Sequence, residues 1–356
     1  MKEFHPFYIA KYPDDSIYVY NLGIADNILV SAASDNTLRL WDRETLKTYK
    51  VIHEVHDHIS DMKISGNHSI LTCGEEGTAK IWDTRTLALC GQFKPGFKIN
   101  IYKLSLNVLA KKMPLLCISE NIEKTMIAAG SALLGSDAYL FLWDQRKQSL
   151  LFSYKESQND DITDVRFDSI QSHRLCAGGC DGLINIFDTR FSIEDDAIIN
   201  VFNNQSSIHR ADFLGPNKVL GLSHMETLSL YNINDISRNN TDNIIDSTYI
   251  SLGDLRSKLN CNYVIDIILN ITKNTAYICC GSHTGKIRLF EFHQDATINK
   301  DEQILLQGHD DSIARSLVFD QQMQIIYTGS ENGEIRANRY ETLQQTPPTK
   351  KIKLYD

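Results

Sequence analysis

The sequence predicts an all-β protein, a propeller of seven blades, on three observations. One phrase recurs along the 356 residues: a polar turn, then alternating residues that end in an aromatic residue and often an Asp. All three tryptophans of the chain occupy the aromatic position of this phrase, as Trp41, Trp82 and Trp143. Apolar and polar residues alternate with period two, which is typical of strands with one face buried. Because one small twisted sheet cannot bury both of its faces, such units stack radially and close into a ring.

The number of blades follows from the spacing of the phrase. Weaker copies follow the three tryptophan copies, and their aromatic position is held by Phe187, Tyr231, Phe290 and, in the last copy, Asn338. Most steps between copies lie near the ~40–45 residues of a four-stranded blade, and two longer steps each carry an insertion of roughly fifteen residues. Seven copies predict seven blades within one domain, residues 1–345. A β-sandwich, the alternative, would not repeat at constant length around one fixed aromatic position.

Closure of the ring must come from the N-terminal segment. The last copy ends at Tyr340, and the residues that follow, 344–348, are poor strand formers. An open propeller would leave unpaired strand edges, which promote aggregation. The aromatic-rich segment from Phe4 to Tyr12 precedes the first copy and has no other assignment. We expect it to pair as the outer strand of the seventh blade and so to join the two ends of the chain.

Composition excludes several classes of function. The chain is 42% hydrophobic and 23% charged, which fits a folded, soluble, monomeric propeller. Its net charge of −9 provides no overall basic surface, so we expect no direct contact with nucleic acid. The first six residues lack the apolar core of a signal peptide, and no apolar run approaches the ~20 residues that span a membrane. These features predict an intracellular protein without membrane attachment, in which the eight cysteines are small packed thiols.

The residues that could carry chemistry favour structural roles. Cys176, Cys180 and His173 lie close in sequence, but a zinc site needs a second ligand pair, so we expect packed thiols and no metal. His56 and His309 could serve as bases, yet each precedes an inner strand, where a histidine can join a buried network with a strand hydroxyl and a turn acid. The sequence holds no phosphate loop, nucleophile elbow or metalloprotease motif. We therefore expect no catalytic residues, no cofactor and no enzymatic activity.

The copies resemble WD40 repeats, in which Gly308-His309 corresponds to the Gly-His element ahead of an inner strand. More specifically, the middle blades resemble the family of WD repeat-containing protein 89. The matching stretches are residues 136–146, 160–167, 181–188 and 194–199, and the likeness continues in order through 263–292. The resemblance implies a plain propeller and a tendency toward the nucleus, and it supplies no catalytic residues to transfer.

A partner site is predicted on one face of the ring, where the loops that enter the inner strands meet the turns between the second and third strands of the blades. We call this the top face. The residues expected just before each turn position are Ser34, Glu75, Ser136, Cys180, His224, His283 and Glu331. Four of them, Glu75, His224, His283 and Glu331, together with His58 and Asp160 from the entering loops, predict a polar, mildly acidic platform for a basic segment. The alternative is that these are ordinary solvated turn residues.

Two classes of function remain open at this point. The favoured hypothesis is a non-enzymatic scaffold or adaptor that binds protein partners through the top face. Escort of a basic protein, such as a ribosomal subunit, is a variant of binding, and a hydrolase of the diphthine methylesterase type is the enzymatic alternative. Residues 346–356 form a basic tail that we expect to be disordered. Three lysines of the tail, Lys350, Lys351 and Lys353, predict a nuclear import signal and therefore a nuclear location, alone or shared with the cytoplasm. The alternative is that the tail only makes this end of the chain more soluble.

Overall fold

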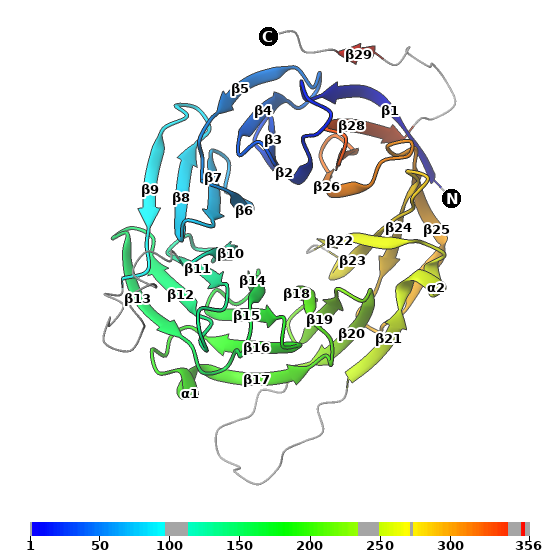
Figure 1. Cartoon of the computed structure of the whole chain (residues 1–356). Coiled ribbons are helices and arrows are strands. Elements are labelled where there is room, and N and C mark those ends of the chain that lie inside the picture. The colour runs from blue at the N-terminus through cyan, green and yellow to red at the C-terminus, as the bar shows by residue number, and fades with distance from the viewer. Residues whose placement is uncertain (1, 97–112, 234–248, 271–272, 341–349, 353–356) are drawn as a thin grey trace.

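The computed structural model describes residues 2–96, 113–233, 249–270, 273–340 and 350–352. Their strands form a ring of four-stranded antiparallel sheets around a central axis (Figure 1). Blades 1 to 3 comprise β2 (Val19–Ala25), β3 (Ile28–Ala33), β4 (Leu38–Asp42), β5 (Thr48–Ile52); β6 (Ile59–Ser65), β7 (Ser69–Gly74), β8 (Thr78–Asp83), β9 (Leu89–Phe93); and β10 (Leu115–Glu120), β11 (Met126–Ser131), β12 (Leu140–Asp144), β13 (Ser149–Tyr154).

The remaining blades follow in chain order. Blades 4 and 5 comprise β14 (Ile162–Phe167), β15 (Arg174–Gly179), β16 (Leu183–Asp188), β17 (Ile198–Asn203) and β18 (Ile208–Phe213), β19 (Lys218–Ser223), β20 (Thr227–Asn232), β21 (Tyr249–Asp254). Blades 6 and 7 comprise β22 (Tyr263–Asn270), β23 (Thr275–Gly281), β24 (Ile287–Phe292), β25 (Ile298–Leu306) and β26 (Ala314–Asp320), β27 (Ile325–Ser330), β28 (Glu334–Tyr340), β1 (Lys2–Lys11). Two short helices, α1 (Glu194–Ala197) and α2 (Leu255–Leu259), lie in loops. The seven-bladed arrangement predicted from the repeat spacing is thus present in the described strands.

The apolar core lies between neighbouring blades. Val30 and Leu40 of blade 1 pack in one buried cluster with Ile59, Met62 and Ile70 of blade 2. Alternation in each strand makes this possible, because one face of a sheet meets the blade before it and the other face meets the blade after it. Each fully buried side chain of this size stabilises the ring by about 1.5–3 kcal/mol. Packing between blades therefore fixes the positions of the loops that connect them.

The ring closes through the N-terminal strand, which confirms the closure predicted from the sequence. β1 runs antiparallel to β28, with Phe4 opposite Tyr340 and Lys11 opposite Glu334. The register shifts between Pro6 and Tyr8, because Pro6 has no backbone N–H to donate to the ladder. β1 also pairs in parallel with β25 over Lys2 to Phe4, so blades 6 and 7 share one continuous sheet. The sequence pattern did not predict this second pairing.

Three residues of the C-terminal tail pair with the closing strand. Lys350–Ile352 form β29, which runs parallel to β1 opposite Tyr8 to Ala10. The edge of a strand presents unpaired N–H and C=O groups that another segment can pair with. β29 uses that edge of β1 over three residues, and the predicted disorder of the tail as a whole stays a prediction. Lys353 and the rest of the tail lie outside the described residues.

A left-handed residue in the turn between the second and third strands ties several blades to the next. Gly77 has φ +79°, and a Cβ at this residue would come within 2.5 Å of the Met113 carbonyl oxygen in the next blade's entering loop. Asn36 and Glu226 occupy the same turn position with positive φ. Their side chains bond to the next blade instead: Asn36 Nδ2 donates to the Asp57 carbonyl at 2.8 Å, and Glu226 accepts from the Val264 N–H at 3.1 Å.

Candidate functional site

A recurring backbone hydrogen bond places the turn residues on the top face. In six of the seven blades the N–H of the residue after the second strand donates to the carbonyl of the residue that precedes the first strand of the same blade. Glu75 donates to His58 at 3.1 Å, His224 to Ser207 at 2.9 Å and Glu331 to Ile313 at 3.0 Å. Ser34 and Cys180 make the equivalent bond. These residues hold the same position in their blades because one backbone contact defines that position.

In blades 3 and 6 the residue predicted from the sequence does not make this bond. In blade 3 it is Ala132, not Ser136, that makes the bond, to the Pro114 carbonyl at 2.9 Å. The turn there runs from residue 132 to residue 139, and this longer turn displaces Ser136 from the predicted position. In blade 6 the His283 N–H donates to the Asn262 side chain at 3.0 Å, so a side-chain oxygen replaces the usual carbonyl.

Two of the predicted site residues, His224 and Glu331, have close side-chain partners. His224 Nδ1 lies 2.7 Å from the hydroxyl of Ser207, and its ring centre lies 5.3 Å from that of His209 on the first strand of blade 5. Glu331 accepts from the Arg315 guanidinium at 2.7 Å, so its charge is compensated.

The other predicted residues have looser contacts. The ring of His283 lies 6.2 Å from that of Tyr263, and the ring of His58 lies 6.4 Å from that of Tyr20. Asp160 accepts a local hydrogen bond from the Asp161 N–H at 2.8 Å. The structure thus brings the six residues to one face but pairs none of them with another.

Exposed apolar residues on the same face were missed by the sequence reasoning. Met225 is 60% exposed in the turn of blade 5, and Tyr18 is 50% exposed just ahead of β2. Leu133, in the long turn of blade 3, is 38% exposed. Exposed apolar side chains among polar ones are typical of a surface that binds another protein. The sequence did contain one sign of this surface, because Met225 stands at the turn position that holds Asp in other blades.

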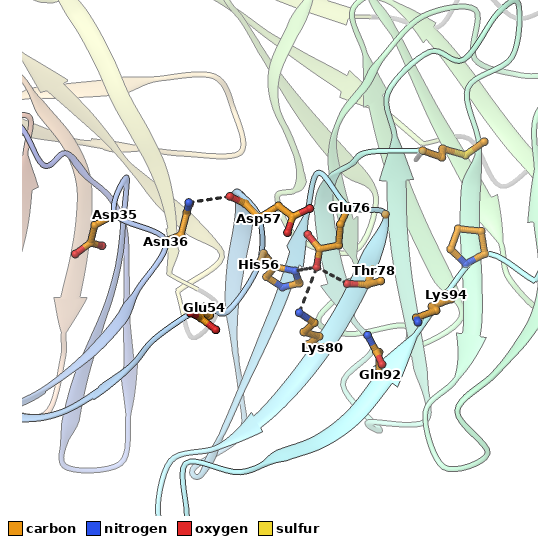
Figure 2. Close-up of a pocket in the computed structure, with 13 residues that line it drawn as sticks. Asp35, Asn36, Glu54, His56, Asp57, Glu76, Thr78, Lys80, Gln92 and Lys94 are labelled. Carbon is orange, nitrogen blue, oxygen red and sulfur yellow. Dashed lines mark hydrogen bonds and ion pairs between the residues drawn. The ribbon is translucent and has the colours of Figure 1, made fainter. Parts of the chain in front are cut away.

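A recess lies between the top-face turns of blades 1 and 2 and the chain leaving blade 2 (Figure 2). Its volume is about 870 Å³. Asp35 and Glu54 stand at one end of the view, Gln92 and Lys94 at the other, and His56, Glu76, Thr78 and Lys80 lie between them. None of the six predicted residues lines the recess, although Asp57 and Glu76 are sequence neighbours of His58 and Glu75. The sequence alone could not show that these two turns enclose a common space.

Part of the recess wall is a buried hydrogen-bond network. His56 Nε2 lies 2.8 Å from the Thr72 hydroxyl, to which Trp82 Nε1 donates at 3.1 Å. His56 Nδ1 bonds to Glu76, which also accepts from Thr78 at 2.6 Å. This arrangement confirms the structural network predicted for His56, with Glu in place of the turn Asp. Both imidazole nitrogens are engaged, which leaves His56 without a free nitrogen for base catalysis.

The charges of the network are fixed by its contacts. Burial lowers the pKa of His56, so the imidazole is neutral at pH 7. Burial alone would raise the pKa of Glu76, but hydrogen bonds from Thr78 and His56 lower it to about 2. Lys80 donates to the Val55 carbonyl at 2.6 Å and lies 3.3 Å from Glu76. Four carboxylates and two lysines line the recess, so the formal charge of its lining is −2. Of these side chains, Glu54 and Lys94 are exposed.

The central channel is lined by the first strands and is internally neutralised. Its cavity is smaller, about 240 Å³. Arg166 lies 3.0 Å from Asp164, and Arg210 lies 3.0 Å from both Asp212 and Asp266. Asp164 also accepts from the Ala211 N–H of the next blade at 3.0 Å. Because these ions pair with one another and with backbone groups, the channel lining holds blades together.

The described part of the chain holds neither a membrane-spanning helix nor a cluster of candidate metal ligands. None of its helices is long and apolar enough to cross a membrane. Among the same residues, no three His, Cys, Asp or Glu side chains are grouped as metal ligands would be.

The comparison with known families agrees with this geometry. The family model "WD domain, G-beta repeat" matches residues 13–42, 48–83 and 300–337, which lie in blades 1, 2, 6 and 7. The ring of four-stranded blades makes the protein a β-propeller, and WD40 repeats are matched in it at the residues just named.

The sequences of proteins from three organisms align with most of this chain. An uncharacterized WD repeat-containing protein of Schizosaccharomyces pombe is 29% identical over 92% of this chain and 96% of its own length. A second uncharacterized WD repeat-containing protein, of Saccharomyces cerevisiae, is 28% identical over 86% of this chain and 75% of its own. The WD repeat-containing protein 89 homolog of Dictyostelium discoideum is 26% identical over 90% of this chain and 82% of its own. This likeness confirms the resemblance predicted from the middle blades.

Proposed function

We propose that this protein is a non-enzymatic scaffold that binds a protein partner through its top face, with a basic segment of the partner seated in the recess between blades 1 and 2. The observation that carries the proposal is the recess itself, about 870 Å³ in volume with a formal lining charge of −2. Opposite charges across an interface speed association and select partners. The exposed Tyr18 next to the blade 1 turn supplies apolar contact beside the charged recess.

Binding is favoured over hydrolysis by the state of the candidate bases. Both ring nitrogens of His56 are engaged in hydrogen bonds. His309 is buried, and its Nε2 lies 2.8 Å from the hydroxyl of Thr328, which corresponds in blade 7 to Thr72 in blade 2. A general base must reach the proton it removes, and side chains this enclosed do not reach a substrate on the surface. Escort of a basic protein remains within the proposal, because the same acidic recess would receive it.

The proposed location is the nucleus, with the tail lysines as the import signal. Lys350 and Lys351 lie in β29 beside β1, and import receptors read short clusters of basic residues. Release of this short strand from β1 would be required for recognition, since a receptor binds an extended and accessible segment.

The experiment compares charge reversal on the top face with the same reversal elsewhere. The tagged chain carrying Glu54→Lys with Glu75→Lys is used to capture partners, which are quantified by mass spectrometry against the wild type. We expect at least a tenfold loss of partners that have basic segments, and a weaker dependence of capture on salt. His224→Ala with His283→Ala tests the opposite sector of the same face.

The matched control is Glu44→Lys, which reverses an exposed charge in the turn after β4, at the other end of the strands. Circular dichroism and thermal unfolding establish that each variant is folded. If folded Glu54→Lys/Glu75→Lys captures the same partners as Glu44→Lys, the recess is not the binding site. If the His224→Ala/His283→Ala variant alone loses them, the partner binds over blades 5 and 6 instead.

A further inference from the structure

The indole of Trp143 bonds differently from the other two tryptophans of the chain. In blades 1 and 2 the tryptophan N–H donates to a hydroxyl in the second strand of its own blade, that of Ser31 at 2.8 Å and that of Thr72 at 3.1 Å. Blade 3 has Ala129 at the equivalent place, two positions after the residue that pairs with the tryptophan. A buried alanine side chain offers no acceptor, so this N–H must bond elsewhere.

The bond goes instead to the chain that leaves blade 2. Trp143 Nε1 donates to the Lys94 carbonyl at 3.0 Å. Phe93, the residue before Lys94, is fully buried, and its ring centroid lies 6.2 Å from that of Trp143. These contacts hold the backbone at Lys94, whereas the lysine side chain is exposed and lines the recess. The missing hydroxyl of blade 3 thus fixes the base of a lysine at the edge of the recess.

Lys94 gives the recess a positive end. Figure 2 shows Lys94 at one end of the recess and Glu54 with Asp35 at the other. Asp35 is compensated, because its carboxylate lies 3.2 Å from the Arg39 guanidinium. Neither Glu54 nor Lys94 forms an ion pair or a side-chain hydrogen bond with another described residue. The free charges at the two ends of the recess are therefore opposite.

The network between these ends is satisfied within the protein. Glu76 is bonded to His56 and Thr78, and Lys80 lies 3.3 Å from the same carboxylate. Opposite charges across an interface select partners, and like charges brought together weaken binding. A purely basic segment would bring a cation against Lys94. A segment that also carries a negative group would meet a complementary charge there.

We propose that the partner segment seated in the recess carries a carboxylate close to its basic residues, and that Lys94 pairs with this carboxylate and so sets the direction of the segment. The inference rests on the proposed function, because it names the chemistry of the segment that binds in that recess. The carboxylate is either the C-terminus of the segment or an acidic side chain within it. In both cases the basic residues lie toward Glu54 and the carboxylate toward Lys94.

The test measures the binding of fluorescent peptides by anisotropy at low salt, where exposed charges are least screened. Each peptide carries a lysine-arginine pair and an uncharged spacer of varied length, and it ends in a free carboxylate, an amide, a glutamate followed by an amide, or a glutamine followed by an amide. We expect a carboxylate-bearing peptide to bind about threefold more tightly than its neutral counterpart, the usual size of one exposed ion pair. The tighter of the two carboxylate arms identifies the source of the carboxylate.

Variants of Lys94 decide the assignment. Lys94→Ala should remove the preference for the carboxylate, and Lys94→Glu should reverse it, because like charges then meet. Lys47→Ala, which changes an exposed lysine in the turn after β4, is the matched control and should keep the preference. Circular dichroism establishes that each variant is folded.

Failure of this inference and failure of the proposed function give different results. If Lys94→Ala strengthens the binding of every basic peptide alike, Lys94 only repels cations, and the inference is overturned while the recess remains the binding site. A preference for the carboxylate that persists in Lys94→Ala would also overturn it. If the folded Glu54→Lys/Glu75→Lys protein binds all the peptides as the wild type does, the recess is not the binding site and the proposed function itself fails.

Discussion

The hydroxyl group of Tyr12 lies 2.7 Å from the Oγ of Ser31, in the buried interior of blade 1. Ser31 Oγ also accepts a hydrogen bond from Trp41 Nε1 at 2.8 Å. In blade 2 a histidine, His56, makes the contact that Tyr12 makes here. Tyr12 directly follows the closing strand β1, so the same segment that completes blade 7 also replaces the missing histidine of blade 1.

Removal of this hydroxyl should weaken the closure measurably. Tyr12→Phe keeps the aromatic side chain, whose ring centroid lies 5.7 Å from that of Trp41. It removes only the hydrogen bond to Ser31. We expect the free energy of unfolding in urea to fall by about 1 kcal/mol, the usual net worth of one such bond. Tyr18→Phe, at an exposed tyrosine, is the control. Equal stability of the two variants would show that the bond contributes nothing.

Deletion of residues 2–11 should have a much larger effect. The deletion exposes the edges of both β28 and β25 and removes Phe4, which is buried against blade 6. We expect aggregation or a melting temperature lowered by more than ten degrees. Deletion of 353–356 is the control for shortening the chain. A melting temperature within a degree or two of the full-length value would refute the role of β1 in closure. Phe4→Ala, a graded variant, should cost about 3–5 kcal/mol.

The stability should depend on pH through the buried histidines. Burial lowers the pKa of His309, so the folded protein keeps this imidazole neutral while the unfolded chain takes up a proton near pH 6.5. Because the unfolded state then binds more protons, the free energy of unfolding should decrease as pH falls from 7 to 5. His309→Gln should reduce this slope by up to about 1.4 kcal/mol per pH unit.

Urea unfolding at several pH values measures that slope. His53→Gln, which changes an exposed histidine, is the matched control for the loss of an imidazole. His56 is shifted in the same direction as His309, so some slope should remain in His309→Gln. An identical slope in all three proteins would rule out His309 as a source of the pH dependence.

The tail lysines should affect location without affecting the fold. Changing Lys350, Lys351 and Lys353 to Ala is expected to shift a fluorescent fusion toward the cytoplasm, because a receptor for basic clusters loses its charges. The melting temperature should change by no more than about two degrees, since β29 pairs with β1 over three residues only. Lys155→Ala with Lys258→Ala controls for loss of positive charge from exposed loops. Unchanged nuclear accumulation would remove the tail from the proposed import mechanism.

The ring and its closure could be predicted from the sequence because they rest on local patterns. Trp41, Trp82 and Trp143 fix the repeat, and the unassigned segment from Phe4 to Tyr12 is the one stretch available to complete blade 7. The network around His56 could also be predicted, since a histidine ahead of an inner strand and a hydroxyl in the next strand have a fixed register. Ser136 shows the limit, because a longer turn moved the expected residue off its position.

The sequence by itself determined the fold class, the blade number and the face on which the turn residues stand, since each depends on period and spacing within about forty residues. The tertiary structure alone decided which loops enclose the recess, that Arg315 compensates Glu331 and that Tyr12 substitutes for a histidine. Each of these relationships joins different blades or the two sides of one blade. Their distances depend on how twisted sheets pack side by side, and a pattern along one strand does not contain that information.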